Sequence, residues 1–204
     1  MFRLNDIKIF WLGHASFKIK TKNKTIYIDP FNITKGEKAD LILITHEHFD
    51  HFDQKSIEIL SDENTVVIGP PTKKEMKIGK KIVFDGIEIE PIEAYNINKE
   101  FHPRGLGVGY LIKINGKTIY HAGDTDFIPE MKNLTGKVDL ALLPIGGTYT
   151  MNIKEAVEAV KTIKPEFVIP MHYGTLKETT ADPEEFKNLV GNISKVEILN
   201  KQPE

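Results

Sequence analysis

The sequence predicts an α+β protein with two similar halves, each a β-hairpin followed by a strand and a helix. The two sheets are expected to pack on each other with the helices outside. Short apolar runs alternate with turn residues through much of the chain, as is typical of strands. Two continuous apolar runs, at 40–44 and 139–143, have the composition of strands buried on both faces.

A weak internal repeat supports the two-halves arrangement. Residues 17–27 contain Phe-Lys-Ile-Lys and then Lys-Thr-Ile-Tyr, and residues 110–120 contain Tyr-Leu-Ile-Lys and then Lys-Thr-Ile-Tyr at the same spacing. An Asp-Leu-x-Leu segment follows each hairpin, at 40–43 and at 139–142. The alternative is that Lys-Thr-Ile-Tyr is a favourable strand sequence that occurs twice. We favour duplication because the order of elements repeats as well.

Capping residues and periodicity define the remaining elements. Asn152 is expected to cap a helix that ends near residue 163, with Glu155 at the reciprocal capping-box position. Asp182 and Pro183 are expected to begin the last helix. A further helix is predicted at 53–61, and strands at 7–11, 16–20, 25–29, 40–44, 65–68, 81–84, 87–94, 107–114, 117–121, 139–143, 167–170 and 196–199.

Composition limits the class of protein. The chain has 204 residues, of which 40% are hydrophobic and 27% charged, with a net charge of −2, so we expect one soluble domain over residues 1–204. It has no block of Lys and Arg, so no nucleic acid is expected as a partner. It has neither a signal-peptide pattern nor an apolar run near the roughly 20 residues that span a bilayer, so we predict a cytoplasmic protein without a membrane partner. The composition leaves open whether the protein forms a homo-oligomer.

The chemically most specific segment is the hexamer His-Glu-His-Phe-Asp-His at 46–51. It follows the buried strand at 40–44 and holds three of the seven histidines of the chain. Imidazole and carboxylate groups suit Zn, Fe or Mn, and without cysteine any metal site must use nitrogen and oxygen. Four such groups diverge too much for one tetrahedral ion, so we expect His46 and His48 to bind one metal and Asp50 and His51 a second. The alternative, a solvated turn, is disfavoured by the density of histidine.

Two further segments offer metal-binding groups after predicted strands. Asp124 follows the strand at 117–121, and a carboxylate there can bridge two cations. His172 follows the strand at 167–170. Each residue alone would more often be a strand-end residue than a ligand. Together with the hexamer they all come just after the carboxyl ends of apolar strands, where buried sheets place ligand sites.

These motifs resemble those of the metallo-β-lactamase superfamily, and in particular its small branch related to L-ascorbate-6-phosphate lactonase. The resemblance covers essentially the whole chain. It implies a four-layer αββα sandwich that binds one or two divalent ions of Zn, Mn or Fe. It assigns as ligands His46, His48, Asp50, His51, Asp124 and His172. The segments that carry it are, in order, WLGHASF (11–17), IDPF (28–31), HEHFDH (46–51), HAGDT (121–125), LPIGG (143–147) and MHYGT (171–175).

One position departs from the family pattern. The family usually has a third histidine for the first metal between the hexamer and the GDT segment, and here Asn96 stands in its place. An amide oxygen is a weaker ligand than imidazole for borderline metals, so we expect the first metal to be bound more weakly than the second. His102, six residues further on, could reach in from a loop.

The remaining polar residues and glycines of these motifs are expected to have supporting roles. His14 is expected to contact substrate or support the metal site, and His121 to be a buried supporting histidine rather than a ligand. Asp29 is expected to satisfy backbone or histidine N–H groups at a strand end. The glycines of 146–147 allow close backbone approach to a ligand, or simply form a tight turn.

The predicted reaction is hydrolysis of a small-molecule phosphoester or lactone. A bound divalent metal lowers the pKa of water towards about 7, and Asp50 would orient the attacking water and accept its proton. His14 would help to stabilise the developing oxyanion. The alternatives are a di-iron oxidoreductase on the same fold, disfavoured because no flavin-binding module follows, and a non-catalytic metal- or ligand-binding protein, disfavoured by the complete second site.

Overall fold

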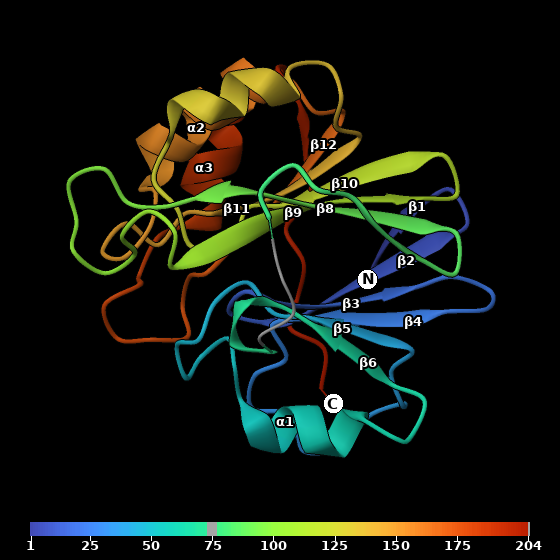
Figure 1. The fold of residues 1–204 in the computed structure, drawn as a ribbon. Helices are drawn as coiled ribbons and strands as arrows, with labels where there is room; N and C mark the ends of the chain where they lie inside the picture. The colour runs from blue at the N-terminus through green and yellow to red at the C-terminus, as the bar shows by residue number, and fades with distance from the viewer. Residues whose placement is uncertain (73–76, 204) are drawn as a thin grey trace. The chain divides into compact units, whose positions relative to one another are not determined.

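The computed structural model describes residues 1–72 and 77–203, and the chain forms two compact units. The first unit comprises Met1–Met76 and Leu199–Glu204, and the second comprises Lys77–Ile198. Each unit is built on one sheet (Figure 1). In the described ranges, no helix is long and apolar enough to cross a membrane. The expectation of a single domain over 1–204 stays a prediction.

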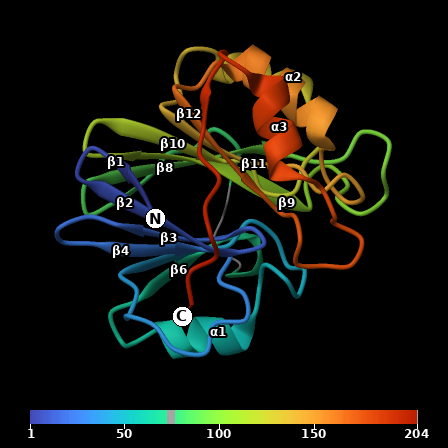
Figure 2. The same ribbon diagram turned by 180° about the vertical axis from the view of Figure 1, so that it is seen from behind.

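The first unit contains a six-stranded sheet in the order β1-β2-β3-β4-β5-β6. Strands β1 to β4 form an antiparallel meander, and β4, β5 and β6 are parallel. Helix α1 lies against one face of this sheet in both views (Figures 1 and 2). Its Leu60 is buried in a cluster with Leu12, Tyr27 and Ile42 of the strands. The elements are β1 Phe2–Leu4, β2 Ile7–Gly13, β3 Ser16–Lys20, β4 Thr25–Ile28, β5 Leu41–Leu43, α1 Gln54–Leu60, β6 Val66–Ile68 and the 3₁₀ helix η1 Pro70–Thr72.

The second unit contains a seven-stranded sheet in the order β13-β12-β11-β10-β9-β8-β7. Strands β7 to β10 are antiparallel, and β10 to β13 are parallel. Helices α2 and α3 lie side by side on one face (Figure 2). Helix α2 begins with the predicted capping box of Asn152 and Glu155. The elements are β7 Ile82–Phe84, β8 Ile87–Ala94, β9 Gly107–Ile114, β10 Lys117–His121, η2 Pro129–Leu134, β11 Leu140–Pro144, α2 Ile153–Ile163, β12 Phe167–Met171, α3 Pro183–Val190 and β13 Lys195–Val196.

The internal repeat forms the same substructure in both units. In the first, the Asp40 carboxylate accepts hydrogen bonds from the Thr25 backbone N at 2.8 Å and from Lys24 Nζ at 3.1 Å. In the second, the Asp139 carboxylate accepts from the Thr118 backbone N at 2.8 Å and from Lys117 Nζ at 2.7 Å. Each aspartate thus ties the start of a parallel strand to the second strand of the preceding hairpin. A strand sequence that merely recurred would not carry the same tertiary bonds, so duplication is the better interpretation.

The structure differs from the predicted elements at the last strand. A strand was expected at 196–199, but β13 ends at Val196. Glu197 N still donates to the Val168 carbonyl at 2.9 Å, and the next bond of this parallel ladder would need an N–H from Pro170. Proline has none, so the pairing stops there. Strand β1 and the 3₁₀ helices η1 and η2 were not predicted, because each is too short to show a periodicity.

We predict that the hydrogen bond from the Thr118 backbone N–H to Asp139, more than the ion pair of Asp139 with Lys117, stabilises the junction between β10 and β11. Asp139→Ala should lower the free energy of unfolding by about 1–2 kcal/mol, because a bond from a backbone N–H to a charged acceptor is lost. Lys117→Ala should cost less than about 1 kcal/mol, because the ion pair is partly exposed. Denaturant unfolding of both variants measures the difference, and equal losses would contradict it.

The same variant has a predicted pH dependence. Burial by itself raises the pKa of Asp139, but the bonds from Lys117 and the Thr118 N–H outweigh it and lower the pKa. A carboxyl with a lowered folded-state pKa stabilises the fold above its unfolded pKa, which is about 3.9. The difference between Asp139→Ala and the unaltered protein should therefore be complete at pH 7 and shrink below about pH 4.

Candidate functional site

A buried aspartate organises the metal-binding segment of the first unit. Asp29, at the end of β4, is fully buried. Its carboxylate accepts from the Thr45 backbone N at 2.8 Å and from Thr45 Oγ1 at 2.6 Å, and it lies 2.7 Å from His51 Nδ1. This is the role expected for Asp29. Because Nδ1 of His51 faces a carboxylate, Nε2 is the His51 nitrogen that is available to bind a metal.

The three histidines of the hexamer lie close together. His46 Nε2 is 3.1 Å from His48 Nδ1, and the His46 ring centroid is 4.1 Å from that of His51. Thr45 Oγ1 lies 3.0 Å from His46 Nδ1, which orients this ring as well. His46 and His51 are buried, and His48 is half-buried. Two ring nitrogens that approach each other this closely are arranged as they would be around a shared cation.

His14 contacts the aspartate of the hexamer. Its Nε2 lies 2.9 Å from Asp50 Oδ2, and both residues are buried. His14 follows β2 in the left-handed region, with φ of 53°. The structure therefore places both predicted catalytic residues in one hydrogen-bonded pair. In this arrangement His14 holds the carboxylate of Asp50 in a fixed orientation.

In the second unit, two histidines converge on one carboxylate oxygen. Asp124 Oδ2 lies 3.0 Å from His172 Nε2 and 3.3 Å from His102 Nε2. All three residues are buried. The Asp124 carboxylate is therefore contacted by two imidazole rings, and both ring types and the carboxylate are chemically suited to bind a divalent cation. The predicted residues Asp124 and His172 are thus together, and His102 joins them.

Asn96 supports His102 instead of replacing a histidine. Its Oδ1 accepts from the His102 backbone N at 3.0 Å and lies 3.0 Å from His102 Nδ1. Its Nδ2 donates to Asp126 Oδ1 at 3.1 Å and to the Tyr149 carbonyl at 3.0 Å. The side chain of Asn96 is therefore fully engaged in holding the loop that carries His102. We expected a weak first metal site because the amide of Asn96 would be one of its ligands. The structure does not place this amide as a ligand, so that reason for weak binding does not hold.

Close backbone packing places His172. A side chain at Gly146 would clash with the His172 carbonyl, so the glycine makes room for this turn. Gly146 thus allows close approach of two backbone segments, whereas the two roles considered above were approach to a ligand and a tight turn. His121 is fully buried at the end of β10, and its Nδ1 accepts from the Gly123 backbone N at 3.2 Å. It thus shapes the turn that leads to Asp124.

The comparisons with known proteins decide the family. Residues 8–172 match the model of the beta-lactamase superfamily domain. The chain belongs to the metallo-β-lactamase superfamily. It is 40% identical to a UPF0173 metal-dependent hydrolase of Pyrococcus abyssi, over 95% of this chain and 96% of that one. It is 42% identical to one of Thermococcus onnurineus with the same coverage. The structure of Igni18, a metallo hydrolase of Ignicoccus hospitalis, is similar with a TM-score of 0.78 and 30% identity, over 96% of this chain and 95% of that one.

Membership confirms the predicted fold class and the general activity. The two mixed sheets with few helices are those of the metallo-β-lactamase α+β sandwich fold. The chain is a metal-dependent hydrolase of this superfamily. The relation to ascorbate-6-phosphate lactonase is not specifically shown by these matches.

Sequence reasoning overlooked two supporting residues. Thr45 bonds Asp29 through both its backbone and its hydroxyl, and Asp126 accepts from Asn96 and from the Ile97 backbone N at 2.9 Å. Thr45 directly precedes the predicted ligand His46, and Asp126 lies two residues after the predicted ligand Asp124. A search for oxygen-bearing side chains within two residues of each ligand would have found them.

We predict that Asn96→Ala weakens metal binding without removing a ligand. The variant loses the contact of Asn96 with His102 Nδ1, which then keeps only the longer contact with the Tyr149 carbonyl at 3.2 Å, and loss of such an orienting partner typically lowers metal affinity about 10–100-fold. Titration of the metal-free variant with Zn²⁺ or Mn²⁺ measures the affinity. Asn188→Ala, at an exposed position of α3, is the control and should bind as the unaltered protein does. Unchanged affinity in Asn96→Ala would show that His102 does not depend on this support.

Proposed function

We propose that the metal ligands of this hydrolase are His46, His48, Asp50, His51, Asp124 and His172, and that His102 is a further histidine ligand beside Asp124. The convergence of His102 and His172 on one oxygen of Asp124 carries this proposal. Asp124 would hold metal through its carboxylate, together with the imidazoles of these two histidines. A donor set dominated by imidazole suits Zn or Fe better than Mn, which prefers oxygen ligands.

The residues of the chain perform defined parts of the reaction. When bound, the metal supplies Lewis acidity that makes water nucleophilic near neutral pH and polarises the group under attack. Asp50 orients the attacking water and accepts its proton. His14 keeps the Asp50 carboxylate in position through the 2.9 Å contact. The carboxylate of Asp29 and the amide of Asn96 fix the rings of His51 and His102, so that little reorganisation accompanies the reaction.

Exposed aromatic rings flank the ligands in each unit. Phe49 and Phe101 are the two exposed phenylalanines of the described chain, at 69% and 47% exposure. Phe49 lies between two proposed ligands in sequence, and its ring centroid is 6.0 Å from that of Phe31. Phe101 precedes His102 and packs edge-on against Tyr149, with centroids 4.7 Å apart. Water-exposed apolar rings beside reactive groups are typical of a surface that binds an apolar ligand.

The charges near these rings favour a lactone over a phosphoester. Lys99, on the loop between Asn96 and His102, is bound to Asp126 and to the Thr150 carbonyl. It is therefore engaged and not available to a phosphate. A neutral lactone or ester with an apolar substituent suits the aromatic surroundings better. We propose this class of small molecule as the substrate.

Replacing the proposed base tests the chemistry separately from metal binding. Asp50→Asn keeps the shape and one oxygen, so the variant should fold and retain part of its metal. Its kcat should fall by about 10²–10⁴, the usual effect of losing a positioned general base. Elemental analysis and turnover are measured on the same preparation, and His51→Ala with His172→Ala serves as the comparison that should lose metal. A metal-loaded Asp50→Asn protein with unaltered turnover would exclude Asp50 as the base.

Replacing the aromatic rings tests the substrate class. For dihydrocoumarin, a lactone with an aromatic body, Phe49→Ala and Phe101→Ala should each raise KM several-fold with a smaller effect on kcat, because apolar contact is lost. Hydrolysis of γ-butyrolactone, which lacks the ring, should change little. The unaltered protein should also prefer dihydrocoumarin to bis(p-nitrophenyl) phosphate. The reverse preference would replace the lactone proposal by the phosphoester.

A further inference from the structure

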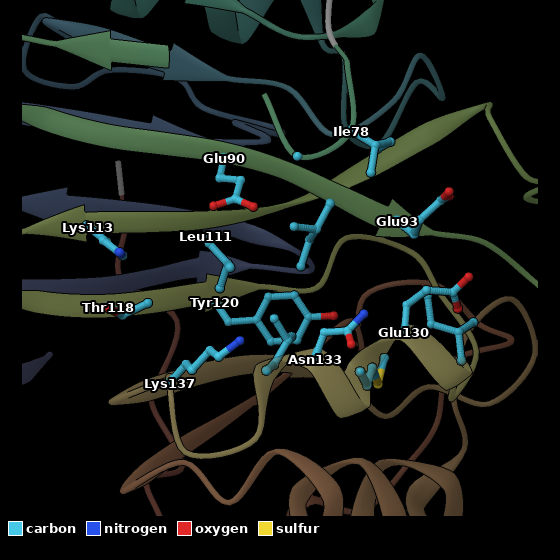
Figure 3. A pocket seen from close by; sticks show the side chains of 15 residues that line it. Ile78, Glu90, Glu93, Leu111, Lys113, Thr118, Tyr120, Glu130, Asn133 and Lys137 are labelled. Carbon is cyan, nitrogen blue, oxygen red and sulfur yellow. The ribbon is translucent and has the colours of Figure 1, made fainter. Parts of the chain in front are cut away.

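A pocket of about 600 Å³ lies in the second unit, lined by strands β8, β9 and β10 and by the segment of η2 (Figure 3). None of the proposed metal ligands lines it. Its floor includes a row of paired residues across the sheet, Glu90, Leu111 and Tyr120. Ile92 and Met131 add further apolar surface. The volume falls in the range of small-molecule sites, and most of the floor is apolar.

The pocket contains one buried polar atom without a partner. Tyr120 is fully buried, and its hydroxyl has no hydrogen-bond partner within residues 1–72 and 77–203. A buried hydroxyl that makes no bond destabilises the folded protein, so such an atom is normally satisfied by water or by a ligand. Burial also raises the pKa of Tyr120, so its hydroxyl stays protonated and can donate a hydrogen bond at neutral pH.

The charges around this hydroxyl select the kind of acceptor. In Figure 3 the hydroxyl end of Tyr120 is directed towards the side of the pocket where Glu93 and Glu130 lie. The carboxylates of both glutamates form ion pairs with Arg104 at 2.8 Å, so the charge of Arg104 is already paired. An anionic acceptor at this end would meet two carboxylates, whereas the two lining lysines, Lys113 and Lys137, lie on the other side of Tyr120 in Figure 3. An uncharged oxygen meets no such repulsion.

We propose that this pocket binds a small uncharged molecule with an apolar body and one carbonyl-type oxygen, which accepts a hydrogen bond from Tyr120. The apolar body lies on Leu111, Ile92 and the Tyr120 ring. This site is separate from the proposed metal ligands and does not depend on the proposed substrate. Because neighbouring residues of a strand point to opposite faces, Tyr120 faces this pocket while His121, next to it on β10, faces away from it.

Three probes of similar size test the proposal on the full-length, metal-loaded protein. Acetophenone has the carbonyl oxygen, ethylbenzene has the same shape without it, and benzoate replaces it by an anion. Ligand-observed NMR titration gives the dissociation constants. We expect acetophenone to bind several-fold more tightly than either of the others. Tighter binding of benzoate, or no binding of acetophenone at millimolar concentration, would overturn the proposal.

Two variants of pocket residues and one control variant test whether the probes bind in this pocket. Tyr120→Phe removes only the hydroxyl, so it should weaken acetophenone binding about fivefold and leave ethylbenzene unchanged. Without probe, its melting temperature should not fall, because the hydroxyl makes no bond in the protein. Leu111→Trp should fill the pocket and abolish binding of both probes, whereas Val83→Trp, at an exposed position of β7 outside the pocket, should not. Unchanged acetophenone binding in Tyr120→Phe would overturn the proposed contact even if Leu111→Trp failed to fold.

Discussion

The buried carboxylate of Asp29 is the interaction on which the metal-binding segment of the first unit depends. It joins the ends of two parallel strands by bonding Thr45, two residues after β5, and it fixes the ring of His51. A fully buried carboxylate is costly unless it is satisfied by several donors, and here three donors meet it. The same bonds that make its burial tolerable also set the direction of a ligand nitrogen. Stability of the strand junction and orientation of the ligand therefore cannot be separated at this residue.

In the second unit an uncharged side chain, that of Asn96, orients a histidine ring. Asn96 bonds His102 through its oxygen, and Asp126 and the Tyr149 carbonyl through its nitrogen. An amide can do this because it both donates and accepts, whereas a carboxylate only accepts and would repel Asp126. This explains why asparagine, and not aspartate or histidine, suits the position. The loop from 96 to 102 then gains a fixed shape without any regular secondary structure.

Much of the fold and of the site was predictable from the sequence, because both depend on local patterns. The apolar runs identified most strands, and the positions just after them identified His46, Asp124 and His172. The supporting contact of Asn96 with His102 was not predictable, because the five intervening residues of irregular loop carry no periodicity that fixes their path. The end of β13 depends on Pro170 in another strand, which is a non-local effect. The register between β12 and β13 had to be known before that proline could be recognised as the cause.

Three residues of the site have an uncommon backbone conformation. His14, Asp29 and His172 lie in the left-handed region, with φ of 53°, 44° and 57°. Residues other than glycine are uncommon there, even asparagine, aspartate and histidine, which occur most often, and each strained residue costs roughly 1–3 kcal/mol. Glycine would remove that strain but offers neither imidazole nor carboxylate. The strain persists because the surrounding bonds outweigh it, so a histidine held at positive φ after a strand is itself an indication that its side chain is needed where it is.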